Sequence, residues 1–466
     1  MGLLLFLWST ERLEMREMHI TKDRNFYKLI LSIALPIACQ NLITFAVSMA
    51  DSVMVGGLGE VSLSAVTIAN QLFFIFMLII FGLGSGANIL VAQYWGKGDT
   101  KAIHKVMSII YKVSVLFAGI FMLIAACVPE QFMGAFTTDA KVIELGGQYL
   151  RTIFVSYIFF ALTNVTISVL RSVQTVKISI VVYGVSLITN IFLNWVLIFG
   201  NLGAPVMGVK GAAIATACAR LVEFLIALGF LIFLEKKIKF KPAYLLKTDK
   251  VLLKDLVVVG GPVVLNELVW ALGSSTLALI VAKLGTEVVA ANSINNVVWQ
   301  FVSIFTMGAG HAGAVIIGNT VGAMEYEKTK EYASTLIFLS IALGLIGAVI
   351  MFGIRPYVLL LYNVSQNTKD IARQIMAAGS LMLVFQSVAF VLMIGVLRGG
   401  GDTKFVLVAD IIFLWAVAIP LGYVAAVILH LPIALVFIAL KCDEILKVGI
   451  SLIRVKRGKW IRNVTR

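Results

Sequence analysis

Residues 178–200, with the sequence ISIVVYGVSLITNIFLNWVLIFG, contain no charged side chain. As an α-helix this run reaches across the hydrocarbon core of a bilayer, which is about 30 Å thick. A second run, residues 106–128, is of similar length and contains one lysine. Lipid offers peptide groups no hydrogen-bond partner, so segments of this kind must cross it as helices. The sequence therefore predicts an all-α integral membrane protein.

The composition of the whole chain agrees with this prediction. Of the 466 residues 60% are hydrophobic and 13% are charged, and the mean hydropathy is +0.99. A soluble protein of this length needs more polar surface. The net charge of +14 does not indicate nucleic-acid binding, because the basic residues fall in short gaps between apolar runs and form no basic domain.

Breaks in the hydropathy pattern divide the chain into twelve predicted transmembrane helices. The first six lie near residues 27–50, 66–94, 108–128, 148–170, 178–200 and 211–234. The second six lie near residues 255–282, 289–317, 333–353, 374–396, 405–429 and 432–453. The predicted domains are an N-terminal tail at 1–27, an N-lobe at 28–234, a lysine-rich linker at 235–254, a C-lobe at 255–453 and a basic tail at 454–466.

The two halves resemble each other at a constant offset of 226 residues. The matching pairs include Pro36 and Pro262, Gly59 and Gly285, Gly82 and Gly308, and Gly96 and Gly322. Six spans return the chain to its starting side, so the two units share one orientation about a pseudo-twofold axis along the membrane normal. Such parallel repeats are typical of secondary transporters in which two lobes rock about a central path.

The basic residues indicate which side faces the cytoplasm. Most of the 38 Lys and Arg residues lie in alternate gaps between spans and in the terminal segments. Because cytoplasmic loops are enriched in these residues, both termini are predicted to be cytoplasmic. The protein is expected in the cell membrane, with the lipid bilayer as a partner.

Carboxylates inside the predicted spans are the strongest candidates for a functional site, because each costs about 2.5–3.5 kcal/mol at a helix centre. Glu267 lies near the middle of the seventh span, and no Lys or Arg occurs between Asp255 and Lys283 to neutralise it. An unpaired acid suits proton exchange or cation binding, and the alternative is a protonated acid that packs helices together. Asp410 in the eleventh span is open to the same two interpretations.

Polar residues of the N-lobe spans form a second group of candidates. Asp51 lies late in the first span, where it is either an interfacial residue or part of a buried site. Asn190 and Asn194, four residues apart, share one face of the fifth span, and Thr216 lies in the sixth. Their oxygens are suitable ligands for a hard monovalent cation, and the alternative is hydrogen bonding between helices.

Arg220 and Glu223, three residues apart on the sixth span, are predicted to form a structural ion pair. The chain lacks a phosphate-binding loop with the Gly-x4-Gly-Lys-Ser/Thr pattern, so energy for transport is expected from an ion gradient or from a separate partner protein. The run Gly399-Gly400-Gly401-Asp402 matches the short pattern of intramembrane aspartyl proteases but lies in a predicted turn. The four cysteines lie alone in apolar contexts, so neither a disulfide nor a metal site is expected.

Several stretches together resemble the multidrug and toxic compound extrusion (MATE) family. In the N-lobe these are Leu35-Pro36, Ala50-Asp51-Ser52, Gly56-Gly57, Ala92-Gln93-Tyr94-Trp95-Gly96, Asn190 to Trp195, and Gly203 to Thr216. In the C-lobe the run Leu397-Arg398-Gly399, followed by Gly401-Asp402-Thr403-Lys404, is similar to the loop after the family's tenth helix. The resemblance covers both halves, from about residue 28 onward.

The resemblance implies a site as well as a fold. Asp51 matches the N-lobe acid involved in cation or proton binding, and Asn190, Asn194 and Thr216 match the oxygen ligands grouped with it. Glu267 matches the span-seven acid of the NorM-like branch. Ser387 stands where that branch has an acid in span ten. A second carboxylate is thus missing from the C-lobe, and coupling is expected in the N-lobe.

The expected function is therefore that of a secondary multidrug antiporter, and the protein is expected to be a monomer. It would exchange Na⁺ or H⁺ for organic, mostly cationic compounds, without a cofactor or catalytic residues. One alternative is an exporter of lipid-linked glycans or metabolites, which would need a cluster of intramembrane arginines; Arg151 and Arg220 are too few. Another is an intramembrane hydrolase, which Asp51 and Glu267 do not favour because they occupy non-equivalent positions of the repeat.

Overall fold

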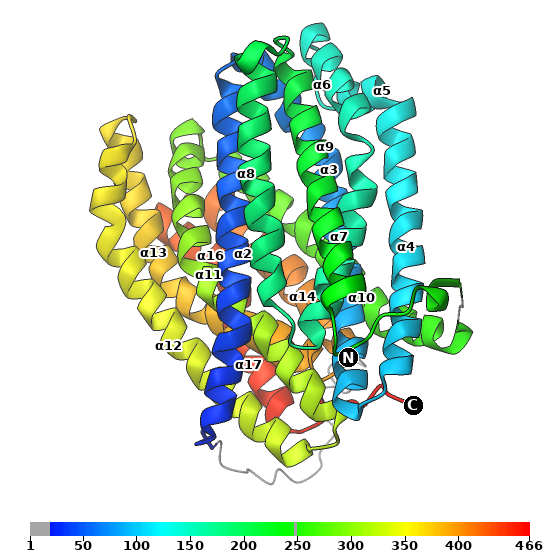
Figure 1. The fold of residues 1–466 in the computed structure, drawn as a ribbon. Helices are drawn as coiled ribbons and strands as arrows, with labels where there is room; N and C mark the ends of the chain where they lie inside the picture. Colours follow the sequence, from blue (N-terminus) through cyan, green and yellow to red (C-terminus); the bar gives the residue numbers. More distant parts are fainter. Residues whose placement is uncertain (1–18, 247–248) are drawn as a thin grey trace.

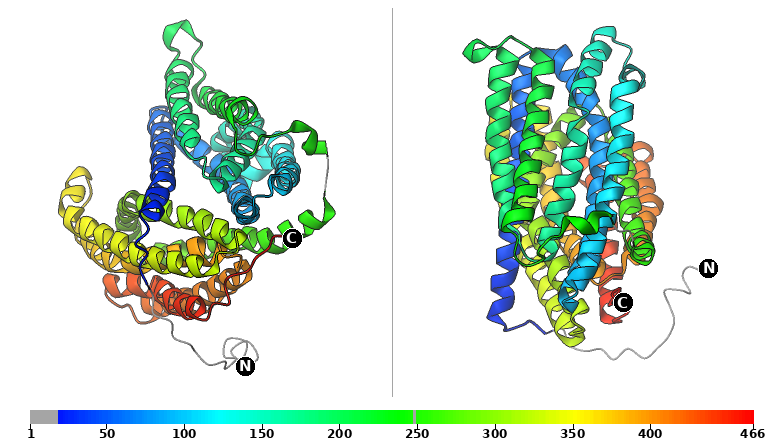
Figure 2. Two further views of the ribbon diagram at one scale, coloured as in Figure 1. Left: turned by 60° about the horizontal axis from the view of Figure 1, so that its bottom comes forward. Right: turned by 45° about the vertical axis from the view of Figure 1, so that its right-hand side comes forward.

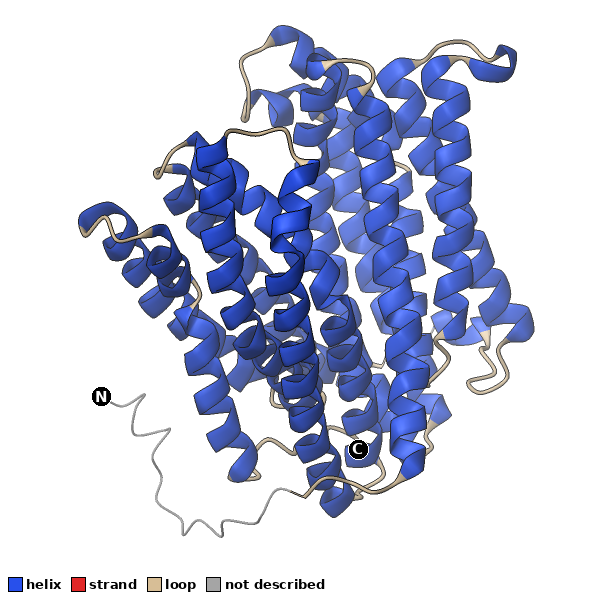
Figure 3. Ribbon diagram, turned by 90° about the vertical axis from the view of Figure 1, so that its left-hand side faces the viewer, coloured by secondary structure: helices blue, strands red, loops and turns tan. Residues whose placement is uncertain are grey.

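A computed structural model describes residues 19–246 and 249–466, and within them all regular secondary structure is helical (Figure 3). The predicted all-α fold is confirmed. Residues 1–18, which make up most of the predicted N-terminal tail, lie outside the described residues, as do residues 247–248 of the predicted linker.

Among the described residues, ten helices are long and apolar enough to cross a membrane. Six of them are single elements: α2 (Arg24–Gly56), α3 (Glu60–Lys97), α4 (Thr100–Cys127), α8 (Lys177–Phe199), α10 (Lys250–Ala282) and α11 (Thr286–Gly322). Three continue into a short 3-10 or π-helix: α9 (Gly208–Gly229) with η2 (Phe230–Leu234), α12 (Tyr326–Val358) with η4 (Leu359–Leu361), and α13 (Gln366–Phe390) with η5 (Val391–Arg398). The tenth comprises α14 (Thr403–Asp410), η6 (Ile411–Ala418), α15 (Ile419–Tyr423) and η7 (Val424–Ile428).

The fourth and twelfth predicted spans are each divided into two helices. The fourth consists of α6 (Ala140–Ile153) and α7 (Ser156–Ser172), which meet at an angle of 54°. The twelfth consists of α16 (Ile433–Leu440) and α17 (Cys442–Lys456), divided at Lys441. Short elements complete the described chain: α5 (Pro129–Gly134), η1 (Asn201–Gly203) and η3 (Pro242–Leu246).

The internal repeat is visible in the ends of the helices. α2 and α10 begin 226 residues apart, at Arg24 and Lys250, and they end at the same offset. Each has a proline inside it, Pro36 or Pro262, at matching positions. The loops that follow turn at Gly59 and Gly285, whose φ angles of 101° and 106° lie in the region that glycine adopts without strain. The duplicated sequence therefore folds into duplicated structure.

The first helix of each half packs against the second helix of the other half. α2 contacts α11, α10 contacts α3, and α3 and α11 contact each other between these pairs. Viewed from below, α2 lies at the junction of the two helix groups (left panel of Figure 2). The lower end of the molecule in Figure 1 holds the start of α2 and the ends of α3 and α11. The C-terminus at Arg466 lies at the same end. We call this end, which carries Lys97, Lys101 and Lys105, the basic end.

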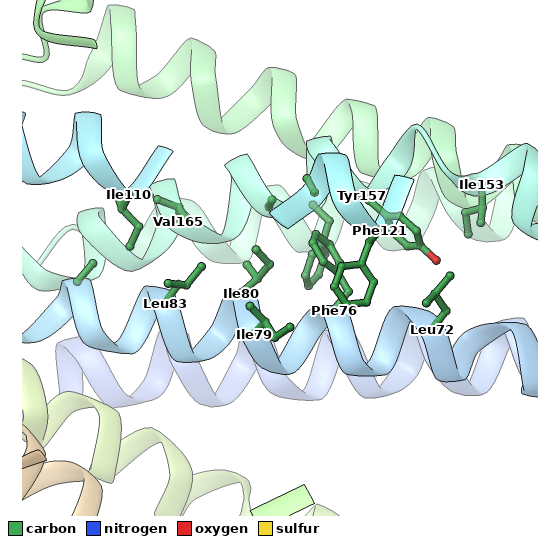
Figure 4. Packing of buried hydrophobic residues seen from close by; sticks show 14 of the residues in the cluster. Leu72, Phe76, Ile79, Ile80, Leu83, Ile110, Phe121, Ile153, Tyr157 and Val165 are labelled. Carbon is green, nitrogen blue, oxygen red and sulfur yellow. The ribbon is translucent and has the colours of Figure 1, made fainter. Parts of the chain in front are cut away.

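Aromatic and aliphatic side chains fill the interior of the N-terminal half. Phe76 of α3 contacts the rings of Phe121 and Tyr157, with centroid distances of 5.2 and 5.1 Å (Figure 4). Apolar side chains on the outer faces, such as Leu116 and Leu123 of α4, are exposed, as expected of a surface in contact with lipid. This packing fixes the positions of the N-lobe helices, several of which contribute the candidate site residues.

Candidate functional site

Asp51, Asn190, Asn194 and Thr216 lie together in the N-lobe. The Nδ2 group of Asn194 donates hydrogen bonds to Asp51 Oδ1 at 2.6 Å and to Asn190 Oδ1 at 3.2 Å. Asn190 Nδ2 in turn donates to the Thr216 hydroxyl at 3.4 Å. Three helices contribute to this cluster: α2, α8 and α9. The candidates from three separate stretches of sequence thus form one connected group.

Asp51 is half-buried and bonded within the helix bundle, so it is not a free interfacial residue. Asn190 and Asn194 are buried, and the Oδ1 atom of Asn194 has no hydrogen-bond partner among the described residues. Buried polar atoms usually have a partner, and a carbonyl oxygen without one next to a carboxylate suits a bound cation. The oxygen atoms of this cluster therefore fit the coordination of Na⁺, or a protonated Asp51.

The polar face of α8 continues toward the basic end beyond the cluster. The Ser186 hydroxyl, one turn from Asn190, donates to Glu223 Oε1 at 2.6 Å. Arg220 Nη1 lies 2.9 Å from the same Glu223 oxygen, so the predicted ion pair is confirmed. The guanidinium of Arg220 also lies 5.0 Å from the ring centroid of Phe160, a cation–π contact. The Glu223 charge is thus compensated inside the lobe.

The prediction that Glu267 is unpaired was wrong. Arg398 Nη1 lies 2.8 Å from Glu267 Oε1, and the arginine side chain is only 5% exposed. Sequence analysis counted Arg398 among the loop charges, but it is the last residue of η5, a π-helix that carries its side chain into the lobe. The partner lies 131 residues from Glu267, so inspection of the seventh span alone does not reveal it.

Asp410 belongs to the same network in the C-lobe. Asn266 Nδ2 donates to Asp410 Oδ2 at 2.6 Å, and Asn266 Oδ1 accepts from Arg398. Lys447 of α17 lies 2.8 Å from Asp410 and 2.8 Å from Asp443. Lys447 lies in the twelfth predicted span, and its side chain is only 4% exposed. Glu267, Asp410 and Asp443 therefore each form an ion pair with a basic residue of the same lobe.

Sequence reasoning missed Asn266, Arg398, Asp443 and Lys447 as members of this network. One signal was present: Asp443 and Lys447 are four residues apart in the twelfth predicted span, as in a helical ion pair. Ser387, where the related branch has an acid, is buried and lies 3.3 Å from the Thr306 hydroxyl. At the position of the missing carboxylate, this chain therefore has a neutral hydroxyl that forms a hydrogen bond with Thr306.

The glycine run before Asp402 forms a turn between η5 and α14. Asp402 is fully buried, 2.7 Å from Arg454 and 3.0 Å from Arg462. An acid held by two arginines cannot act as the proton donor or acceptor of an aspartyl protease. Within the described residues, no hydrogen bond or ion pair joins Asp51 to Glu267, and no group of three or more His, Cys, Asp or Glu side chains is arranged to hold a metal ion.

A sequence model of the MatE family matches residues 36–196 and 262–424, two segments that start 226 residues apart. The chain belongs to the MatE family. Members of this family are membrane transporters and not enzymes, so the expected fold and protein class are confirmed. The match covers one segment in each half, in agreement with the repeat in the helices.

Relatives in the family are similar along most of their length. The chain is 23% identical over 434 residues to a probable multidrug resistance protein NorM of Thermotoga maritima, covering 93% of each chain. It is 27% identical over 410 residues to a NorM of Photorhabdus laumondii, covering 86% of this chain and 87% of the relative. These similarities confirm the NorM-like character of this MatE chain.

Solved structures of MatE proteins share the fold. A multidrug resistance MATE family transporter of the MOP superfamily, in an outward-facing conformation, matches with a TM-score of 0.85 and 19% identity. The match covers 94% of this chain and 99% of that chain. Twelve transmembrane helices in two lobes are thereby confirmed as the architecture of this chain.

Proposed function

We propose that this MatE protein is a secondary antiporter that exports organic, mostly cationic compounds in exchange for Na⁺ or H⁺. It would act as a monomer in the cell membrane, with the basic end and both termini in the cytoplasm. Relatives named as multidrug resistance proteins support this class of cargo. The arrangement of Asp51, Asn190, Asn194 and Thr216 supports the N-lobe as the place of coupling.

The hydrogen bond from Asn194 to Asp51 is the observation on which the proposal rests. Asp51 supplies the one negative charge of the cluster, and the other three residues supply neutral oxygens. A cation bound there would gain the carboxylate and the unpartnered Oδ1 of Asn194. A proton on Asp51 would remove the charge, so Na⁺ and H⁺ compete for one site.

Coupling requires that the two occupants favour different arrangements of the lobes. A ligand shifts a conformational equilibrium only by its differential affinity for the two states. If the cation and the cargo stabilise opposite arrangements, binding of one promotes release of the other on the opposite side. The pseudo-twofold arrangement of α3 and α11 provides two similar lobes for such alternating access.

The C-lobe acids are less suited to binding a mobile cation. Glu267 is paired with Arg398, and Asp410 with Lys447, at 2.8 Å in both cases. A sodium ion would have to displace a tethered cation, and the displaced charge would be left buried without compensation. We infer that Glu267 contributes to the cycle through its ion pair and not as a sodium ligand.

The runner-up, an exporter of lipid-linked glycans, requires free positive charge to hold an anionic head group. Arg220 is partly buried beside Glu223, and Arg398 is buried beside Glu267. Arg151 lies 2.6 Å from Glu130 and is more than half exposed, away from the lobe interior. With these charges compensated, an organic cation is the better match to the interior of the protein.

Ethidium efflux from reconstituted vesicles tests the proposal. Ethidium is loaded inside, and Na⁺ and H⁺ gradients are imposed separately, with vesicles lacking protein as the control. We expect at least one gradient to drive efflux above the rate of leakage, and dissipating that gradient with an ionophore to stop it. If neither gradient accelerates efflux of ethidium or of other organic cations, the antiporter proposal is wrong.

A further inference from the structure

The chain that follows α17 lies across the boundary between the two halves. We call residues 457–466 the strap. It leaves α17 at the basic end and reaches α3 of the N-lobe, more than 360 positions away in sequence. Its terminus lies beside the lower part of the molecule in Figures 1 and 2. The strap was predicted to be a basic cytoplasmic tail, and its contacts show that it is an ordered part of the bundle.

The strap is anchored to the C-lobe by burial and by charge. Trp460 is fully buried against Gly400, where a Cβ atom would lie 2.4 Å from the indole ring. The backbone N–H of Arg462 donates to Gly400 O at 2.8 Å, and its guanidinium lies 3.0 Å from Asp402. Burying an indole is worth several times more than one exposed hydrogen bond, so this side of the strap is firmly held.

The strap is bound to the N-lobe through Gln93 of α3. Gln93 Nε2 donates to Arg462 O at 3.1 Å, and Gln93 Oε1 accepts from the backbone N–H of Val464 at 2.8 Å. Both functional groups of this buried amide are therefore used by the strap. Lys97, one turn further along α3, donates to the carbonyl of Arg466. Val464 adds one partly buried apolar contact, with the cluster of Ile89, Val259 and Val263. The C-lobe anchor differs in that its apolar side chain, Trp460, is large and fully buried.

Gln93 also lies where the two lobes approach most closely. A Cβ atom on Gly322 of α11 would lie 1.9 Å from the carbonyl oxygen of Gln93. A Cβ atom on Gly96 of α3 would lie at the same distance from the carbonyl oxygen of Asn319. The residues exchange roles across the pseudo-twofold axis, since Asn319 is the repeat equivalent of Gln93. The strap thus crosses the tightest contact between α3 and α11.

We infer that the strap is a latch that stabilises the closed arrangement of the lobes at the basic end. When α3 and α11 separate there, Gln93 must release Arg462 and Val464, while Trp460 keeps the strap on the C-lobe. Release at the N-lobe is the easier step, because it breaks hydrogen bonds and the partly buried contact of Val464 but leaves the fully buried indole in place. This inference goes beyond the proposed coupling, since it concerns which end of the transporter is closed in the absence of cargo and gradient.

The repeat provides a matched control for this latch. Asn319 occupies the position of Gln93 in the other half, but its amide has no hydrogen-bond partner among the described residues. A substitution to alanine at either position removes a buried amide at the same depth and leaves the backbone contact with glycine intact. Only the change at Gln93 removes bonds to the strap.

Distances between spin labels test the latch in the full chain. Lys101 and Glu327 are exposed, repeat-equivalent residues near the starts of α4 and α12, and each is replaced by a labelled cysteine in a background without Cys39, Cys127, Cys218 and Cys442. We expect a predominantly short distance in this reference protein. Gln93→Ala and Trp460→Ala should each raise the ratio of long to short distances about tenfold, equivalent to about 1.4 kcal/mol. Asn319→Ala should leave the ratio within about twofold of the reference.

Two results would overturn the latch. One is a Gln93→Ala distribution that matches that of Asn319→Ala, and the other is a reference protein that is mainly open at the basic end. If Trp460→Ala fails to fold, Gln93→Ala alone decides, because it changes an α3 side chain and leaves the indole anchor intact. The measurement needs no cargo or gradient, so its outcome is independent of the coupling proposal.

Discussion

Asn194 donates a 2.6 Å hydrogen bond to Asp51, a residue 143 positions earlier in the chain. The bond joins α8 to α2, and α2 also packs against α11 of the other lobe. The carboxylate therefore lies on the helix that connects the candidate site to the boundary between lobes. A change in the charge of Asp51 alters a contact between helices, which is the physical requirement for coupling occupancy to conformation.

Substitution of Asp51 by asparagine tests the N-lobe site. It retains size and hydrogen bonding but removes the negative charge, so we expect gradient-driven ethidium efflux to fall to the leakage rate with either ion. Asn194→Ala removes a neutral ligand, and we expect it mainly to weaken the dependence on Na⁺. Glu60→Gln, an exposed residue at the start of α3, is the control for loss of an acid. Retained coupled efflux in Asp51→Asn would show that another group couples the ions.

The ion pair between Glu267 and Arg398 predicts a rescue. Removing one partner of a buried pair costs about 3–5 kcal/mol, and the partial exposure of Glu267 lowers this toward about 1–3 kcal/mol. We expect Glu267→Gln to reduce efflux and thermal stability, and Glu267→Gln with Arg398→Gln to restore much of both. Thermal unfolding and ethidium efflux of the wild type and the two variants measure this. A double variant that is stable but inactive would instead assign a direct coupling role to the Glu267 carboxylate.

Lys447 is predicted to be more important for stability than Asp410. Lys447→Met leaves Asp410 and Asp443 buried without their cation, and we expect a loss of about 3–5 kcal/mol. Asp410→Asn retains an acceptor for Asn266, and Lys447 keeps Asp443 at 2.8 Å, so the expected loss is about 1 kcal/mol. Thermal unfolding in detergent compares the two variants. Equal losses would mean that Asp443 does not neutralise Lys447.

Gly96→Ala is expected to prevent full closure at the basic end. Its Cβ atom would lie 1.9 Å from the carbonyl oxygen of Asn319, and a backbone neighbour cannot move aside as a side chain can. We expect normal membrane expression with less than about a tenth of wild-type efflux. Gly119→Ala, in α4 with no neighbouring atom within 4 Å, is the control and should be neutral or stabilising by up to about 1 kcal/mol. Wild-type efflux in Gly96→Ala would show that this close contact is dispensable.

The predicted topology is tested by labelling Lys459, which is exposed on the strap. A cysteine at this position, in a background without the four native cysteines, should react with a membrane-impermeant maleimide only after the cell membrane is opened. The physical reason is that the basic loops remain on the cytoplasmic side. The control is a second protein that retains Cys127 as its single cysteine, which is exposed at the end of α4 opposite the basic end and should react from outside. Labelling of Lys459→Cys in intact cells would reverse the orientation.

Local sequence was sufficient to predict the positions of the spans. The predicted ends differ from the helices by at most eight residues, as at residue 108, where α4 begins at Thr100. Hydropathy determines whether a segment enters the bilayer, and each spanning segment satisfies its own backbone hydrogen bonds. The same reasoning did not predict the break in the fourth span, because composition changes little at Phe154. In the twelfth span the charged run that starts at Lys441 was not recognised as the start of a second helix.

The candidate site was predicted only in part. Asn190 and Asn194 share a helix face by their spacing alone, and the family resemblance grouped them with Asp51. The ion pair of Arg220 and Glu223 also followed from local spacing, and the structure confirms it. Arg398 was assigned to a loop, and Lys447 was not recognised as the partner of a buried acid. Hydropathy depends on the residues of one segment, so it contains no information about an acid on another helix that neutralises a buried basic side chain.

By itself, the sequence determined the membrane environment, the twelve spans and the duplication, because each is a property of local composition or of a fixed offset. The tertiary structure decided which charges meet. Glu267 and Arg398 are 131 positions apart, and the strap reaches Gln93 from the other end of the chain. Such contacts depend on how helices cross and on where a π-helix turns a side chain inward. These are properties of the packed bundle, and no single segment contains them.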